Sequence, residues 1–223
     1  MGITRRVFVS GAVAAPLVAQ LGVTGVAHAA APGDQRLTAL DGLAELRLTD
    51  VARTRLADNG IQVQAVAPAT PITGADGTTV EGVKLTPEYA TGTVTALGQP
   101  GQGSGRALGG IVLSNSVARM EMAGMRVLLP EGVVFGFLKV DDDWVGELPL
   151  YAADPATMRV DLQAGAPGQP VVVRGNRIQA KPTREGVEAF TDAFGVALFT
   201  TDDVVFAAAV QGNAWPLPTL PGV

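Results

Sequence analysis

Polar and apolar residues alternate through the middle of the chain, from Val117 to Tyr151. Apolar residues at every second position are typical of strands with one buried face, because successive side chains of a strand point to opposite faces. Ala123-Gly124 predicts a two-residue turn, since glycine adopts a positive φ at no steric cost, and Asp141–Asp143 predicts a polar turn. The pattern therefore predicts an antiparallel meander with strands at 117–122, 125–129, 133–140 and 144–151.

Two short helices are predicted on either side of this meander. Thr49 begins the first, which runs to Asp58, because its hydroxyl can accept a hydrogen bond from a free N–H group of the first turn. The second begins at Thr183 or Pro182, carries an apolar stripe at every third or fourth position, and ends at Gly195. Such a stripe is suited to packing against a sheet.

The remaining pattern predicts a mainly β fold. Further short strands are expected at 43–48, 61–66, 78–85, 171–173, 196–199 and 204–210. Residues 99–110, with the sequence QPGQGSGRALGG, predict a flexible loop because glycines crowd this stretch. The fold class we predict is an antiparallel β-sandwich or barrel with two short helices, one plugging each side.

Composition supports one globular domain. The chain has 223 residues, of which 47% are hydrophobic and 17% charged, and its many glycines and prolines favour short strands joined by turns. Without a leader, roughly 190 residues would remain, which is enough for one core. We therefore predict a single mainly β domain at 30–223, with a loose N-terminal segment at 31–41 and a proline-rich C-terminal tail at 215–223.

Residues 1–29 predict an export signal peptide of the twin-arginine type. Thr4–Phe8 reads TRRVF, a weakly apolar stretch follows at 11–26, and Ala27-His28-Ala29 fits a cleavage site. The expected partners during export are the twin-arginine machinery and signal peptidase, and the expected location is secreted or in the cell envelope. An ordinary secretory signal and an uncleaved anchor are the alternatives. No membrane span is predicted in the mature chain.

The mature chain lacks two kinds of reactive side chain. Cysteine is absent, and the single histidine, His28, lies inside the predicted leader. Their absence excludes disulfides, nucleophile–base pairs built on cysteine or histidine, and histidine-ligated zinc. The net charge of -5, with no basic run, argues against nucleic acid as a partner. We accordingly predict no catalytic residue, no metal site and no cofactor.

Two groups of acidic residues could support other chemistry. Asp141, Asp143 and Gly146 match part of a calcium-binding loop, but Val145 and Ala152 stand where the loop needs oxygen ligands, so a solvated hairpin tip is expected. A carboxylate-dependent hydrolase would need two converging acids, and no spacing singles out a pair. Its candidates are Glu121, Glu131, Asp143 and Glu147.

The methionines gather in the meander and just after it. Flexible thioether side chains commonly fill irregular gaps in a core, and this is the interpretation we favour. The alternative is an adaptable pocket for an apolar ligand. The residues concerned are Met120, Met122, Met125 and Met158.

Several short motifs resemble those of exported actinobacterial β-proteins, and their layout is distantly similar to the HtaA-type haem-uptake domain. The motifs are Thr49–Ile61, Pro68-Ala69-Thr70, Gly110–Met125 and Phe194-Gly195. The resemblance implies a secreted β-sandwich with small helices that binds haem through a tyrosine. Here only Tyr89 and Tyr151 could supply that group, no mature histidine could support it, and packing is the alternative role of both.

The function predicted from the sequence is that of an exported, non-catalytic β-protein that binds an unidentified ligand or envelope component. The first alternative is a module for uptake of haem or another apolar ligand. The second is a carboxylate-dependent hydrolase.

Overall fold

The computed structural model describes residues 35–95, 98–163, 166 and 169–216, which form one thirteen-stranded antiparallel sheet and two short helices. The prediction of a mainly β, antiparallel fold with two short helices is confirmed. The helices are α3 (Asp50–Asp58) and α4 (Arg184–Phe194). The strands are β1 (Gln35–Ala39), β2 (Leu43–Leu48), β3 (Gln62–Val66), β4 (Thr70–Thr73), β5 (Val80–Val94), β6 (Pro100–Leu108), β7 (Gly110–Ser114), β8 (Arg119–Leu129), β9 (Val133–Val140), β10 (Asp143–Ala153), β11 (Arg159–Gln163), β12 (Val171–Pro182) and β13 (Phe206–Pro216).

Eight of the strands close into a ring. Strand β13 pairs with both β2 and β12, so the order β2-β5-β6-β8-β9-β10-β12-β13 returns to its start. The other five strands extend this wall: β1 pairs with β13 and β5, β11 with β12, β4 with β5, β7 with β8, and β3 with β7. Closure satisfies the hydrogen-bonding groups at both long edges of the wall.

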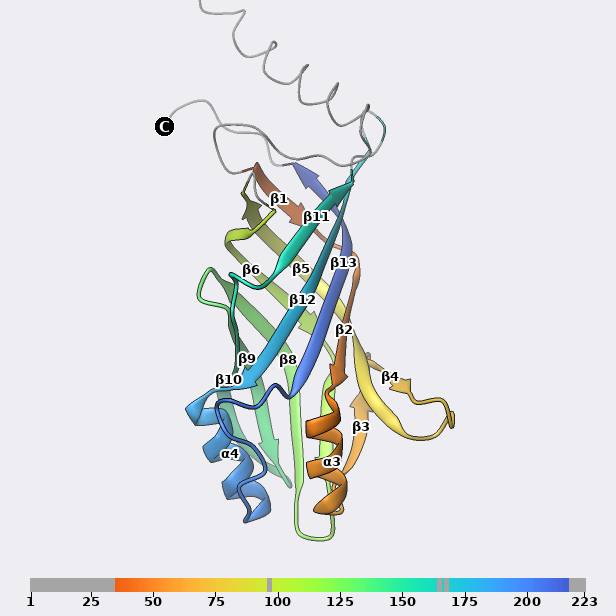
Figure 1. Ribbon diagram of the computed structural model, residues 1–223, viewed down its shortest axis with the longest axis vertical. Helices are drawn as coiled ribbons and strands as arrows, with labels where there is room; N and C mark the ends of the chain where they lie inside the picture. The colour runs from red at the N-terminus through yellow and green to blue at the C-terminus, as the bar shows by residue number, and fades with distance from the viewer. Residues whose placement is uncertain (1–34, 96–97, 164–165, 167–168, 217–223) are drawn as a thin grey trace, which may run out of the picture.

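Both helices lie at the same end of the elongated molecule (Figure 1). The prediction of one helix on each side is therefore wrong. Strands β2 and β12 are both antiparallel to β13, so they run in the same direction and the helices that follow them begin at the same end. Leu56 of α3 and Phe190 of α4 accordingly join one hydrophobic core.

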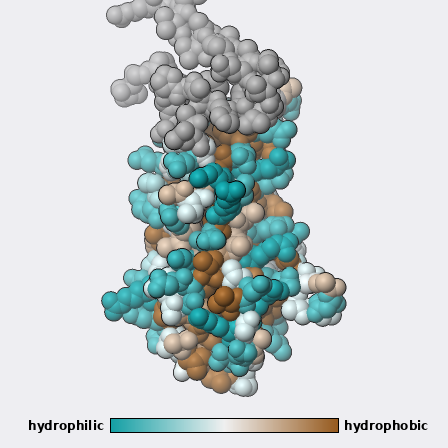
Figure 2. Space-filling model, viewed as in Figure 1, coloured by the Kyte–Doolittle hydropathy of each residue, from teal (hydrophilic) through white to brown (hydrophobic). Residues whose placement is uncertain are grey.

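The main core fills this helical end of the ring, and a smaller cluster around Leu37 and Leu162 lies apart from it. Met120, Met122 and Met125 are buried in the main core, and Met158 is buried as well. The core-filling interpretation of the methionines is thus confirmed. In the view of Figure 1, the surface is largely hydrophilic, with apolar side chains in a strip over the region between α3 and α4 (Figure 2).

Strand β8 continues through Ala123-Gly124, where a turn was predicted. Gly124 has φ 61°, and the pairing with β9 shifts register between Ala123 and Arg126, which is the signature of a β-bulge. The strand pairs with β7 before the bulge and with β6 after it. The glycine therefore lets one long strand change partners.

The glycine-rich stretch at 99–110 is not a loop but supplies β6 and the start of β7. Gly101, Gly103 and Gly105 occupy alternate positions and therefore share one face of β6. A Cβ atom on Gly103 would lie 2.5 Å from the carbonyl oxygen of Thr91. The glycines thus permit close strand contact, which composition alone does not distinguish from flexibility.

Toward the two ends of the described chain, two segments differ from the prediction. Residues 35–39, predicted to be part of a loose segment, form β1. Residues 196–199, predicted to be a strand, contain buried Leu198 and Phe199 but no strand. The predicted signal peptide at 1–29 and the tail beyond Pro216 lie outside the described residues. Among the helices that the structure describes, none has the length and apolar character needed to cross a membrane.

Candidate functional site

The outer surface of the ring carries a row of opposed side chains across five neighbouring strands. Tyr89 of β5 is paired with Arg106 of β6, which is paired with Arg126 of β8. Arg126 is in turn paired with Phe135 of β9, and Phe135 with Pro149 of β10. Directly opposed residues in antiparallel strands point to the same face, so these five residues form one row.

Arg126 is held firmly within this row. Its Nε and Nη2 atoms donate to the two carboxylate oxygens of Glu147, each at 3.0 Å, and its guanidinium carbon lies 4.4 Å from the centre of the Phe135 ring. The hydrogen bonds from Arg126 lower the pKa of Glu147, and those to Glu147 raise the pKa of Arg126. Glu147 is therefore ionised at neutral pH.

Arg106 adds a second positive charge beside Tyr89. Its Nε lies 3.4 Å from a carboxylate oxygen of Glu88, and both side chains are well exposed. The charge of Arg106 also contributes to the lowered pKa of Glu147. Two arginines thus share one row with the half-buried Tyr89, and each of them is paired with a glutamate.

An open apolar hollow adjoins the row. It is lined by Ala123, Gly124, Phe137, Trp144 and Gly146, and the side chains of Phe137 and Trp144 are 39% and 67% exposed. Phe137 is paired with Glu147 across β9 and β10, which places the hollow next to the Arg126–Glu147 ion pair. The row, the hollow and Glu147 together are called the aromatic–arginine face below.

The two tyrosines lie in opposite environments. Tyr151 is only 3% exposed, its hydroxyl contacts the sulfur of Met122 at 3.5 Å, and its ring meets that of Phe206 edge to face. Burial raises the pKa of Tyr151 far above its ordinary value, so the core would have to open before this phenol could ionise. Tyr89 is half-buried at the outer surface. Of the two candidates, only Tyr89 is accessible to a ligand.

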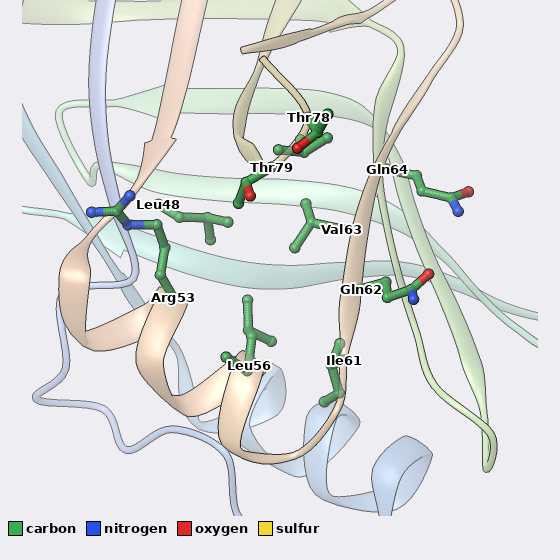
Figure 3. Close-up of a pocket in the computed structure, with 11 residues that line it drawn as sticks. Leu48, Arg53, Leu56, Ile61, Gln62, Val63, Gln64, Thr78 and Thr79 are labelled. Carbon is green, nitrogen blue, oxygen red and sulfur yellow. The ribbon is translucent and has the colours of Figure 1, made fainter. Parts of the chain in front are cut away.

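A second hollow of about 350 Å³ lies between α3, β3 and the start of β5 (Figure 3). Its floor is apolar, with Leu48, Leu56 and Val63 pointing into it, and Gln62 and Gln64 point away. This volume is near the lower limit for ligand pockets.

Most polar groups at the rim of this hollow are bonded to other side chains of the protein. Arg53 forms ion pairs with Asp50 and Glu81, although its Nε is buried without a partner. The hydroxyl of Thr79 donates to Asp76. The hollow therefore offers apolar contacts and one unused donor, but no nucleophile–base pair.

Two of the four acids predicted for a hydrolase, Glu121 and Glu147, have structural partners. Glu121 is 3.1 Å from the guanidinium of Arg119, and Glu147 is fixed by Arg126. Asp141 accepts a hydrogen bond from the backbone N–H of Arg119, so the acidic turn between β9 and β10 is joined to the start of β8. Within the described residues, no three acidic side chains gather as a metal site.

No sequence motif singles out Arg106, Arg126 or Phe135. Each looks like an ordinary surface position of an alternating strand, and the row follows only from the register between strands distant in sequence. The nearest sequence signal was the interruption of alternation at Gly124, after which Arg126 takes the outward position.

No family model and no curated protein sequence matches the chain. Its structure is similar to the C-terminal domain of HtaA from Corynebacterium glutamicum, with a TM-score of 0.51 and 11% identity over 80% of this chain and 99% of that domain. The heme-binding protein HtaB from the same organism gives a TM-score of 0.46 and 11% identity over 82% and 96% of the two chains. The distant similarity to the HtaA-type domain, predicted from short motifs, is confirmed at the level of the fold.

Proposed function

We propose that this protein is an exported, non-catalytic binding protein that holds a flat, largely apolar ligand of the haem class on its aromatic–arginine face. The observation that carries the proposal is the position of Tyr89, half-exposed and in one row with Arg106, Arg126 and Phe135. The distant resemblance to the HtaA-type domain implies a tyrosine ligand, and only Tyr89 is placed to act as one.

The chemistry of the face fits such a ligand. A tyrosine oxygen is an established ligand of haem iron. The exposed rings of Phe137 and Trp144 offer apolar, flat surface against which a macrocycle can pack. Haem bound here would supply the metal centre, while the chain would orient the macrocycle and limit its contact with water.

A binding role fits the acids better than catalysis does. A general acid needs a pKa near the working pH, whereas hydrogen bonds from Arg126 lower the pKa of Glu147. Glu121 is likewise engaged by Arg119. These pairs support the non-catalytic part of the proposal.

Addition of haemin to the purified protein tests this proposal. We expect a shift of the Soret band for the wild type and an affinity at least about tenfold lower for Tyr89→Phe, because even indirect partners of a metal typically contribute 10–100-fold. Tyr151→Phe is the matched control and should bind as the wild type does. Absence of a shift, or equal affinity of wild type and Tyr89→Phe, would contradict the proposal.

The cellular location is part of the same proposal, with residues 30–223 as the mature single domain. The support is the paired Arg5 and Arg6 followed by Phe8 in the leader. Replacement of both arginines by lysine should leave the full chain inside the cell, whereas Val7→Ala should be exported normally. Fractionation followed by detection of the tagged protein measures both, and unchanged export of the double-lysine variant would show that the twin-arginine assignment is wrong.

A further inference from the structure

The contacts of the aromatic–arginine face hold the guanidinium group of Arg126 in an orientation that suits a carboxylate of a ligand. Two contacts fix the orientation of Arg126: its guanidinium group lies over the Phe135 ring, and it donates two hydrogen bonds to Glu147. The planar guanidinium recognises a carboxylate through two parallel N–H bonds. Glu147 therefore occupies the geometry that an acidic group of a ligand would require.

Exchange of one carboxylate for another on Arg126 has a low cost. The side chain of Glu147 is 32% exposed, so it can return to water without being stranded as a buried charge. Arg126 meanwhile keeps its orientation over Phe135. Arg106 lies one strand away in the same row, at the distance of directly opposed residues, and can receive a second acidic group.

We infer that Arg126 and Arg106 recognise acidic groups of the ligand, and that Glu147 occupies Arg126 until a ligand carboxylate replaces it. This inference rests on the proposed function, because it places the ligand on the same face. It narrows the ligand class to flat aromatic molecules that carry carboxylates. Glu147 is then a specificity-determining residue, which lowers the affinity for every acid that must displace it.

Metal-free protoporphyrin IX and its dimethyl ester separate this inference from coordination by Tyr89. Neither compound has iron to coordinate, and they differ only in whether their two acid groups are free or esterified. Quenching of porphyrin fluorescence would give the affinity of each for wild type, Glu147→Gln, Arg126→Gln and Arg106→Gln. Glu185→Gln, on the exposed first turn of α4, is the matched control for loss of a negative charge.

The expected results differ in direction between variants. Wild type should bind the diacid more tightly than the diester, and Glu147→Gln should tighten diacid binding by about two- to fivefold, the size expected for one partly exposed ion pair. Arg126→Gln and Arg106→Gln should each weaken diacid binding by a similar factor. Binding of the diester should be unchanged in all variants, and Glu185→Gln should behave as the wild type does.

Equal binding of diacid and diester by the wild type, or unchanged or weaker diacid binding by Glu147→Gln, would overturn the inference. If haemin still binds through Tyr89 in that case, the proposed function survives and only the recognition of acids is wrong. If the wild type binds neither porphyrin nor haemin, both are wrong. Thermal unfolding of each variant in the absence of ligand shows whether a change in affinity reflects a loss of fold.

Discussion

A buried phenol normally has a strong hydrogen-bond acceptor, but the hydroxyl of Tyr151 contacts the sulfur of Met122. Thioether sulfur is a weak acceptor, so this contact recovers little of the hydration that the hydroxyl lost on folding. The ring itself packs against Phe190 and Phe206. At this position the aromatic ring, and not the hydroxyl, stabilises the core.

Tyr151→Phe should therefore change the free energy of unfolding by less than about 1 kcal/mol, with either sign. Tyr151→Ala should cost about 3–5 kcal/mol, because it removes the ring and leaves a cavity. Urea unfolding of both variants measures the difference. A loss of more than about 2 kcal/mol for Tyr151→Phe would show that the hydroxyl contributes more than its contact with Met122 suggests.

At this scale the sequence predicted which residue types could act, but not which individual residue. Tyr89 and Tyr151 were equivalent candidates because each lies at the border of a strand-like stretch. What separates them is burial, and burial depends on which face of each strand turns inward. That choice is made by strands that are remote in sequence, so no local pattern carries it.

Among the secondary-structure elements, α3 is tied to the segment between α4 and β13 by one acidic side chain. Arg55 of α3 donates to both carboxylate oxygens of Asp203, and Thr200 donates to Asp203 through its N–H at 2.7 Å and its hydroxyl at 2.8 Å. Burial disfavours the charged carboxylate, but the hydrogen bonds from Thr200 and Arg55 outweigh burial and lower the pKa of Asp203. Ionised Asp203 thus links the two helical regions.

Asp203→Asn should lower the free energy of unfolding by about 1–3 kcal/mol at neutral pH, the usual contribution of hydrogen bonds to a charged group. Because the pKa of Asp203 is depressed in the folded state, its contribution is present above the ordinary value of 3.8 and is lost as the pH falls below it. The difference between wild type and variant should therefore shrink in acid.

Urea unfolding at neutral pH and at about pH 3 measures this trend. The neighbouring Asp202 is exposed, so Asp202→Asn is the control and should stay within about 0.5 kcal/mol of the wild type. A difference for Asp203→Asn that grows in acid would refute the assignment.

The helices were the most predictable elements because their signals are local. The hydroxyl of Thr49 accepts from the N–H of Ala52 at 3.2 Å, that of Thr183 accepts from Gly186 at 2.9 Å, and Gly195 ends α4 with φ 69°. Glycines in strands were misread for the opposite reason. Gly103 and Gly124 are explained by contacts with neighbouring strands, which a local pattern does not contain.

For the whole molecule, alternation predicted the fold class but not the closed order of strands or the shared end of the helices. Both depend on the pairing of β13 with β2 and β12. The aromatic–arginine face depends on the same kind of information, since its row exists only once the registers of β5, β6, β8 and β9 are fixed. The similarity in fold to the C-terminal domain of HtaA from Corynebacterium glutamicum is consistent with this arrangement of strands.

The position of β13 in the ring also bears on when the protein can reach its native state. β13, the last of the described strands along the sequence, is the partner of β2, which lies near the start of the described residues. A growing polypeptide that still lacks β13 cannot close the ring, so the edges of β2 and β12 stay open to pairing with other chains until β13 has been added.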